Sequence, residues 1–476
     1  MRRLSLLAAF ALLLAPAAAP AAPQSSFPDT PAGRRGASFF EAFHVGTEER
    51  LAAYFSTAVS PDGLKQRPAA ERARRLAAIR KEIGDVVVKR VDAPAPGQLV
   101  VVSEGKGGEL TKWTLELGPP PDAFLLGIGV DEAAPADLDG PAAPMTEDEA
   151  VARVEALASE AAASGRFSGV VLLAREGKVR LHRAWGLAHR GLSVPNRPDT
   201  KFNLGSINKL FTRVAVAQLL AAGRLSLDDP LGKHLPDYPN ADARTATIRQ
   251  LLDMQSGIGD FFGPEFEAMP KDRLRKNADF LPLFAKKPLH FAPGAGRRYS
   301  NGGYIVLGEV VAKASGRDYH DFVRENVYGR AGMKETDSFE ADVPVPNLAE
   351  GYTRPEEGGG LRSNVYTRPA RGSSAGGGYS TAPDLLRFTK ALFADELLPP
   401  AYTEWVVARV EPVPGKPLGD RRRGGLGVAG GAPGINAVLE ADRETGWVVV
   451  VLANLDPPAA ESLGKGIRRL LDAVKR

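Results

Sequence analysis

Four polar residues constrain this chain more than any other feature: Ser206, Lys209, Tyr299 and Asn301. Ser206 and Lys209 stand three positions apart, and the other two follow well downstream, behind a Pro-Gly loop. The segment 206–222 has the pattern of a helix, on which residues three apart share a face. We therefore expect the Lys209 amine to reach the Ser206 hydroxyl.

These side chains are suited to acyl transfer. A serine hydroxyl becomes a good nucleophile when a neighbouring base takes its proton. Lys209 can be that base only if burial or nearby positive charge holds its amine neutral. Tyr299 offers a second proton carrier, and Asn301 can orient the lysine or the substrate. This chemistry predicts depressed pKa values for both the amine and the phenol.

The same short motifs also occur elsewhere in the chain. Ser-x-x-Lys recurs at 103–106 and 462–465, and Tyr-x-Asn recurs at 238–240. Only Ser206 stands at a predicted strand-to-helix junction with a Tyr-x-Asn downstream. The alternative interpretation is a surface Ser–Lys pair and a buried tyrosine.

Residues 146–476 resemble the serine β-lactamase and penicillin-binding-protein superfamily, specifically its class C β-lactamase, esterase and D-amino-peptidase branch, and Ser-x-x-Lys is among that superfamily's signatures. The resemblance is found, in the order typical of the family, in FNLGSINK (202–209), TIRQLL with SG (247–257), PG through YSN (293–301) and GGGYSTAPD (376–384). It implies a β-lactamase-like fold and an acyl-enzyme on Ser206. It also implies that the backbone N–H groups of Ser206 and Gly431 hold the oxyanion, with Gly430 beside them.

One motif departs from the family pattern. The family's third motif, Lys-Thr-Gly or His-x-Gly, corresponds here to LGVAGGAPG (426–434), which places Val428 at the basic position. Valine cannot bind a substrate carboxylate. This favours an esterase or peptidase over a β-lactamase. The alternative is that Arg421, Arg422 or Arg423 supplies the missing charge.

Composition excludes several other functions. A net charge of +4 over 476 residues is small and gives no indication of nucleic-acid binding. The chain has no cysteines, and its six histidines are not spaced as metal ligands. We therefore expect no metal and no cofactor, and a small-molecule ester, amide or peptide as substrate.

The first residues have the pattern of an export signal. Arg2 and Arg3 precede an apolar run over 4–15, and Ala19-Pro20-Ala21 offers a cleavage site. We expect a signal peptide over 1–21, no membrane span after its cleavage, and a periplasmic or secreted bacterial protein. The alternative is an uncleaved anchor.

Residues 36–132 are expected to form a small α+β domain. Segments 38–56 and 69–83 have amphipathic helical patterns, and the strand-like runs that follow suggest an antiparallel meander over 86–91, 98–103, 111–117 and 123–130. We find no catalytic constellation in it, which favours a structural or docking role over a second active site. Residues 133–145, rich in Ala, Pro and Asp, form the predicted linker.

The domain over 146–476 opens with a capping box at Thr146 and Glu149. Its predicted strands lie near both ends of the domain, over 167–174, 178–185, 436–441 and 446–454, and a helix over 462–474 closes it. The middle, 200–400, is helical and loop-rich. The prediction is an α+β fold, with an antiparallel sheet flanked by helices and a helical lobe.

Three functions remain open: a secreted serine hydrolase, a penicillin-binding protein that acylates without efficient turnover, and an inactive binding protein of the same fold. The intact Ser-Lys-Tyr-Asn set favours the first. The sequence does not determine the acyl group, the leaving group or the oligomeric state.

Overall fold

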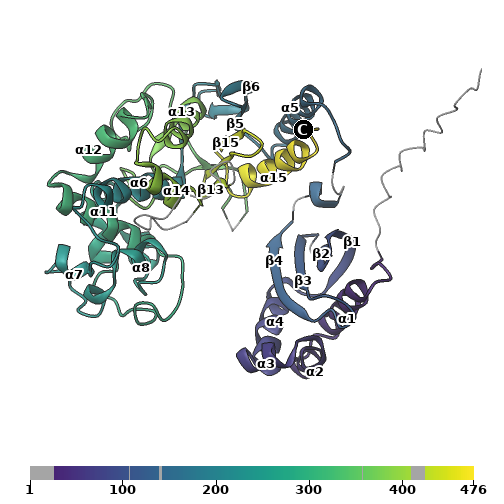
Figure 1. Ribbon diagram of the computed structural model, residues 1–476. Coiled ribbons are helices and arrows are strands. Elements are labelled where there is room, and N and C mark those ends of the chain that lie inside the picture. The colour runs from purple at the N-terminus through teal and green to yellow at the C-terminus, as the bar shows by residue number, and fades with distance from the viewer. Residues whose placement is uncertain are drawn as a thin grey trace, which may run out of the picture. The chain divides into compact units, whose positions relative to one another are not determined.

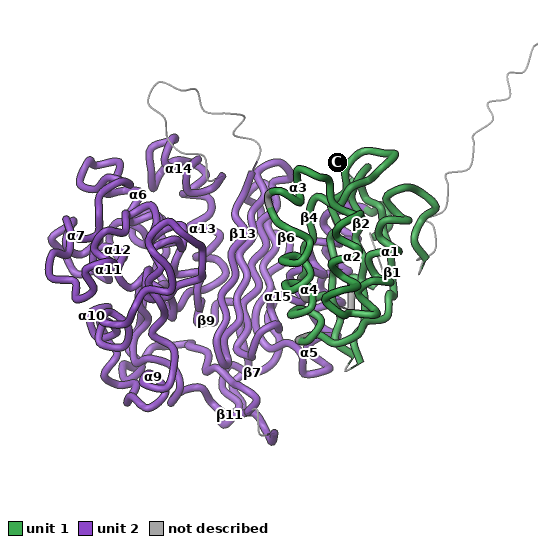
Figure 2. The backbone as a smooth tube through the Cα atoms, turned by 90° about the horizontal axis from the view of Figure 1, so that it is seen from below, with its two compact units in different colours: residues 1–145, 475–476 green, residues 146–474 purple. Residues whose placement is uncertain are grey.

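The computed structural model describes residues 26–106, 108–133, 135–138, 142–355, 358–408 and 424–475. The expected signal peptide and Arg421–Arg423 lie outside these ranges. The chain divides into two compact units, one up to Met145 together with Lys475, the other over 146–474 (Figure 2). None of the helices within the described ranges has the length and apolar character needed to cross a membrane.

The first unit packs helices on a four-stranded antiparallel meander (Figure 1). Its centre is Trp113, which is fully buried, makes edge contacts with Phe40 and Phe43, and donates a hydrogen bond to Ser103 Oγ at 2.8 Å. The elements are α1 (Pro31–Val45), α2 (Glu48–Ala58), α3 (Pro61–Gln66), α4 (Ala69–Ile83), β1 (Val86–Ala95), β2 (Gln98–Gly105), β3 (Leu110–Leu117) and β4 (Leu125–Glu132).

The predicted helix over 38–56 is wrong, because the chain breaks there into α1 and α2. Gly46 ends α1 in the left-handed region at φ 70°, where glycine has no steric penalty. Thr47 then caps α2 by accepting a hydrogen bond from the Arg50 N–H at 3.2 Å.

The second unit is built on a five-stranded antiparallel sheet, ordered β13-β14-β15-β5-β6. Strands from both ends of the unit pair directly, β15 with β5. Helices α5 and α15 cover one face, and the helical lobe with α13 covers the other (Figures 1 and 2). The bounds are β5 (Gly169–Arg175), β6 (Lys178–Trp185), β13 (Gly425–Ala432), β14 (Ile435–Asp442), β15 (Trp447–Ala453), α5 (Glu147–Ala163), α13 (Ala382–Phe393) and α15 (Ala459–Asp472).

The helical lobe surrounds α6 (Asn208–Ala221), which is buried along most of its length. It also contains α7 (Leu231–His234), α8 (Ile248–Leu252), α9 (Pro264–Ala268), α10 (Asn277–Phe280), α11 (Asn301–Ser315), α12 (Tyr319–Val323) and α14 (Pro400–Ala408).

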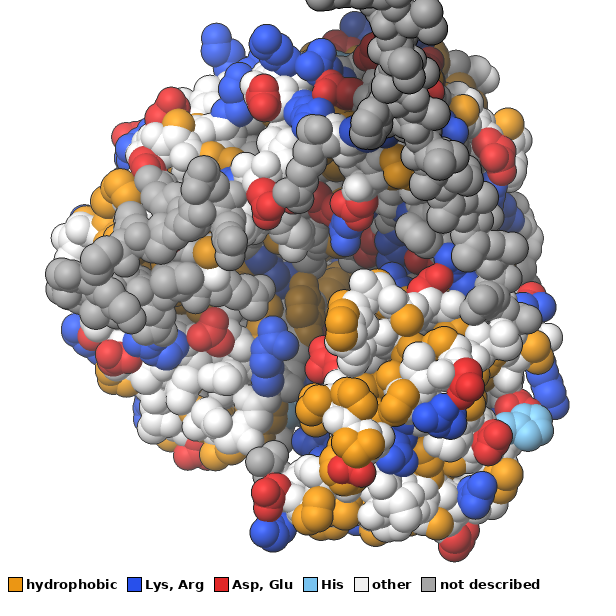
Figure 3. Space-filling view, turned by 45° about the vertical axis from the view of Figure 1, so that its right-hand side comes forward, with side chains coloured by type: hydrophobic (Ala, Val, Ile, Leu, Met, Phe, Trp, Pro, Cys, Tyr) orange, Lys and Arg blue, Asp and Glu red, His pale blue; other side chains and the backbone are white. Residues whose placement is uncertain are grey.

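The predicted capping box is confirmed, since Thr146 and Glu149 exchange both hydrogen bonds. The α+β layout, with a helical lobe beside an antiparallel sheet, is also confirmed. Charged side chains of both signs are interspersed on the face shown in Figure 3.

Candidate active site

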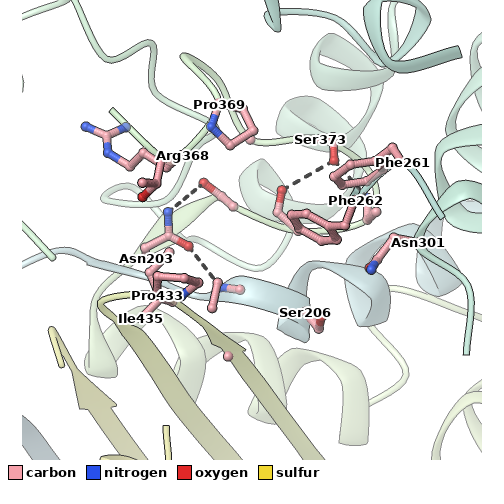
Figure 4. A pocket seen from close by; sticks show the side chains of 18 of the residues that line it. Asn203, Ser206, Phe261, Phe262, Asn301, Arg368, Pro369, Ser373, Pro433 and Ile435 are labelled. Carbon is pink, nitrogen blue, oxygen red and sulfur yellow. Dashed lines mark hydrogen bonds between the residues drawn. The ribbon is translucent and has the colours of Figure 1, made fainter. Parts of the chain in front are cut away.

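Ser206 lies in a 3-10 turn, η2 (Gly205–Ile207), between β9 (Phe202–Asn203) and α6. The turn therefore replaces the predicted first turn of an α-helix. Gly205 adopts a positive φ of 50°, and its N–H donates to Asn203 Oδ1 at 3.0 Å. This local bond closes the sharp bend that directs Ser206 toward the pocket (Figure 4).

Lys209, in the first turn of α6, is buried with its amine beside Ser206. Its Nζ lies 3.1 Å from Ser206 Oγ, 2.7 Å from Asn301 Oδ1 and 2.5 Å from the Ala375 carbonyl oxygen. Burial lowers the pKa of the amine to about 7, against an opposing effect of Asp260. The expectation that burial depresses this pKa is therefore confirmed.

Tyr299 contacts both Ser206 and Lys209, whose Nζ lies 4.8 Å from the centroid of the Tyr299 ring. Its side chain is 54% exposed, and its hydroxyl donates to Ser206 Oγ at 2.7 Å. Partial burial of the phenol raises its pKa, the hydrogen bond to Ser206 acts in the other direction, and the charge of Asp260 raises the pKa further. The expected depression of the Tyr299 pKa is therefore wrong, and the phenol is protonated in this state.

Asn301 begins α11 and is oriented by an acidic residue that the sequence analysis missed. Its Nδ2 and its backbone N–H both donate to Asp260 Oδ2, at 2.8 and 3.2 Å. This arrangement turns Asn301 Oδ1 toward Lys209. Asp260 lies in the loop after Ser256-Gly257. An acid in a loop has no periodic pattern, so its position in sequence gave little signal.

A second missed residue, Asn208, connects the segment after Ser206 to the loop over 373–378. It is fully buried, its Oδ1 accepts from the Gly378 N–H at 3.2 Å, and its Nδ2 donates to the Ser373 carbonyl at 3.4 Å. These bonds hold the loop that supplies the Ala375 carbonyl to Lys209. In the sequence, only its position between Ser206 and Lys209 could have indicated that Asn208 belongs to the site.

Gly430 and Gly431 of strand β13 lie against η2, the turn that contains Ser206. A Cβ on Gly430 would lie 2.0 Å from the Leu204 carbonyl oxygen and 2.7 Å from the Ser206 nitrogen, so only glycine permits this approach. A Cβ on Gly205 would lie 2.9 Å from the Gly431 nitrogen. The backbone nitrogens of Ser206 and Gly431 are thus close to one another.

Val428 is placed differently from these glycines. It is half-buried against the hydrophobic core and is not among the residues that line the pocket, whereas its neighbour Ala429 is. Successive side chains of a strand point to opposite faces, which separates the two positions. The pocket wall at this point is therefore apolar.

The site opens into a pocket of about 360 Å³. Figure 4 shows Phe261 and Phe262 on one side, near Asn301, and Pro433 and Ile435 on the other, with Ser206 at the base. The charged residues on the pocket lining are Arg368, Arg371 and Glu461.

Comparisons with known proteins agree with this geometry. The Beta-lactamase family model matches residues 154–473. Penicillin-binding protein 4* of Bacillus subtilis is 30% identical over 253 residues, covering 50% of this chain and 55% of that protein. Esterase EstB of Burkholderia gladioli is 32% identical over 293 residues, covering 55% of this chain and 74% of that protein. The chain thus spans about half the length of the first of these relatives.

Solved structures give the same result. A penicillin-binding protein from Bacillus halodurans has a TM-score of 0.59 at 32% identity, covering 67% of this chain and 99% of that one. The D-amino acid amidase of Ochrobactrum anthropi SV3, at 22% identity and a TM-score of 0.57, shares the fold, covering 67% of this chain and 97% of that one. The resemblance seen in the sequence motifs is confirmed, and the chain belongs to the beta-lactamase and penicillin-binding-protein family.

Proposed function

We propose that this chain is an exported serine hydrolase that forms an acyl-enzyme on Ser206 and acts on a neutral ester or peptide-like amide. The observation that supports this most directly is the set of three partners around Lys209 Nζ. The esterase among the relatives, EstB, supports the same reaction class. The pattern at the N-terminus supports export.

The surroundings of the Lys209 amine match those that a neutral amine requires. A neutral amine has two N–H bonds and one lone pair. The Asn301 Oδ1 and the Ala375 carbonyl are both acceptors, and they use the two N–H bonds. In the structure Lys209 Nζ donates to Ser206 Oγ at 3.1 Å, and in the neutral amine the lone pair is left at this distance for the Ser206 hydroxyl proton. With a pKa of about 7, a large fraction of the amine is neutral at neutral pH.

In the first half-reaction, Ser206 Oγ forms a bond to the substrate carbonyl carbon as its proton passes to Lys209. The resulting tetrahedral oxyanion is held by the N–H groups of Ser206 and Gly431. The bond to the leaving group then breaks as Tyr299 gives the leaving group its phenolic proton, and Lys209 passes to the Tyr299 oxygen the proton that it took from Ser206. The protonated phenol is suited to this acidic role. Backbone N–H donors positioned in advance for an oxyanion typically stabilise the transition state by about 3 kcal/mol each.

In the second half-reaction, a water molecule attacks the acyl carbon. One of its protons passes to the Lys209–Tyr299 pair, and its oxygen forms the new bond to carbon. The ester bond to Ser206 Oγ breaks and the serine regains that proton. The acid product leaves, and the site returns to its starting state.

The pocket favours an apolar acyl group. Phe261 and Phe262 both line the pocket with their ring centroids 4.4 Å apart and their planes tilted by 41°, and Phe262 is 52% exposed. Burial of such a surface by a substrate is favourable at roughly 25 cal/mol per Å². Val428 places no charge at the basic position of the third motif, and β13 presents the uncharged Ala429 to the pocket. We therefore propose a preference for neutral acyl groups and hence esterase or peptidase activity over β-lactamase activity.

A fluorophosphonate probe and a panel of short-chain esters, a cephalosporin and D-Ala peptides test this proposal. We expect the wild type to label and to turn over esters, and Ser206→Ala to do neither. Ser462→Ala is the matched control, because it alters a second Ser-x-x-Lys on α15 with no tyrosine partner motif. Labelling without turnover would instead indicate a penicillin-binding protein. No labelling would indicate an inactive binding protein.

A further inference from the structure

Asn436 is a fully buried polar residue on β14, behind the glycines of β13. Its Nδ2 donates to the Gly430 carbonyl at 3.2 Å and to Glu461 Oε2 at 3.0 Å. Its Oδ1 accepts from the N–H groups of Ala460 and Glu461, at 2.6 and 3.1 Å. Every donor and acceptor position of the amide is therefore used.

These bonds determine the orientation of the amide. The N–H groups of Ala460 and Glu461 belong to the first turn of α15, where backbone donors lack partners within the helix. Only the amide oxygen can accept from them. The Nδ2 must consequently face Gly430 and the Glu461 carboxylate, so the start of α15 fixes the direction of the bond to Gly430.

The bond to Gly430 acts on the same peptide group that contains the Gly431 N–H. In a planar trans peptide the C=O and N–H bonds point in opposite directions. A donor that holds the Gly430 carbonyl from behind therefore holds the Gly431 N–H toward the opposite side. It also polarises the peptide, since hydrogen bonds in a chain strengthen one another.

We propose that Asn436 is a positioning residue, which aims and polarises the Gly431 N–H at the developing oxyanion through its bond to the Gly430 carbonyl. This rests on the proposed function for the role of Gly431. Glu461, which lines the pocket, is the second anchor of the Asn436 amide.

The test is Asn436→Asp, which keeps the shape and removes both N–H donors. We expect kcat for an ester to fall about ten- to a hundredfold, somewhat less than on deletion of an oxyanion donor, with KM within about twofold. The affinity of a boronic acid inhibitor, whose adduct with Ser206 places an oxygen at the oxyanion position, should fall in parallel. If Asn436→Asp does not fold, Asn436→Ala removes the same donors without adding a charge or a new donor.

Asn454→Asp is the matched control. Asn454 is also buried, and its Nδ2 likewise donates two hydrogen bonds, here to the carbonyls of Leu187 and Glu350, which do not line the pocket. It should lower the melting temperature without the selective loss of kcat. Equal kcat losses in the two variants at equal melting temperature would overturn the proposal, as would a loss confined to KM.

A readout independent of turnover separates this inference from the proposed function. The amide ¹⁵N shift of Gly431 responds to hydrogen bonding at the preceding carbonyl, so it should move in the Asn436 variants and not in Asn454→Asp. An unmoved shift would refute the positioning role even in an active enzyme. If the Gly431 ¹⁵N shift changes in the Asn436 variants but the wild type neither labels nor turns over substrate, the contact between Asn436 and Gly430 is supported and the proposed function is refuted.

Discussion

Asp260→Asn should move the acidic limb of the pH–rate profile to lower pH. In the proposed mechanism Lys209 acts as a base only when its amine is neutral, so activity is expected to rise as pH passes the Lys209 pKa of about 7. Asp260 opposes the lowering of that pKa by stabilising the charged amine. Removing the carboxylate charge therefore lowers the pKa further, and the neutral form persists to lower pH.

The size of this effect follows from the hydrogen-bond chain. Lys209 Nζ is 2.7 Å from Asn301 Oδ1, and Asn301 Nδ2 is 2.8 Å from Asp260 Oδ2. The two charges are thus roughly 7 Å apart, which corresponds to about 2 kcal/mol at an effective dielectric constant of about 20. Water in the pocket screens part of this, so we expect a movement of on the order of one pH unit. At pH 6 the rate, relative to its plateau, should rise about fivefold.

The assay is kcat/KM for a neutral ester between pH 5 and 9. Each profile is divided by its own plateau value, so that the pH of the acidic limb is compared and the plateau rate is not. Loss of the charged acceptor for Asn301 is expected to lower the plateau as well. Asp228→Asn is the control, because it removes the same charge at a side chain that is 79% exposed. A limb that stays in place, or moves to higher pH, would show that Lys209 is not the titrating base or that Asp260 does not act on it.

Three further predictions concern the same site. Lys209→Met should abolish fluorophosphonate labelling. In the wild type, the free energy of unfolding should rise between about pH 7 and 10, because Lys209 binds a proton in the unfolded chain but not in the folded one over this range. Thermal denaturation across this range should show the rise in the wild type and not in Lys209→Met. Gly430→Ala should reduce kcat by more than about a hundredfold, since its methyl group would meet the Leu204 carbonyl at 2.0 Å; near-normal ester kinetics would contradict this close approach. Ala429→Arg should raise kcat/KM for a carboxylate-bearing ester more than for a neutral one, and more than Val428→His does, because Ala429 lines the pocket; paired kinetics with the two esters check both variants.

Local patterns were sufficient to predict much of the fold. The capping box at Thr146 and strand β6 (Lys178–Trp185) follow from neighbouring residues alone, and the structure has both as predicted. The break between α1 and α2 was missed, because a Gly-Thr pair inside an amphipathic pattern is compatible with a continuous helix until tertiary packing selects the turn.

The candidate site was predictable only in its motif residues. Ser206, Lys209, Tyr299 and Asn301 converge as the spacing and resemblance suggested. Asp260 could not be found, since it acts through contacts between segments distant in sequence. The direction of the Tyr299 pKa shift also depends on three-dimensional burial, which residue spacing does not specify.

The pairing of β15 with β5 has a consequence for synthesis. Three strands of the five-stranded sheet, together with Gly430 and Gly431, come from residues after 424, whereas the segment that carries Ser206 and Lys209 is complete by residue 209. A growing chain therefore has its serine and its lysine long before it has the strand that faces them. Because such long-range pairings form late, hydrolysis should be absent until the last fifty or so residues have left the ribosome. With the proposed export completed before that pairing forms, the chain would become an active hydrolase only at its destination.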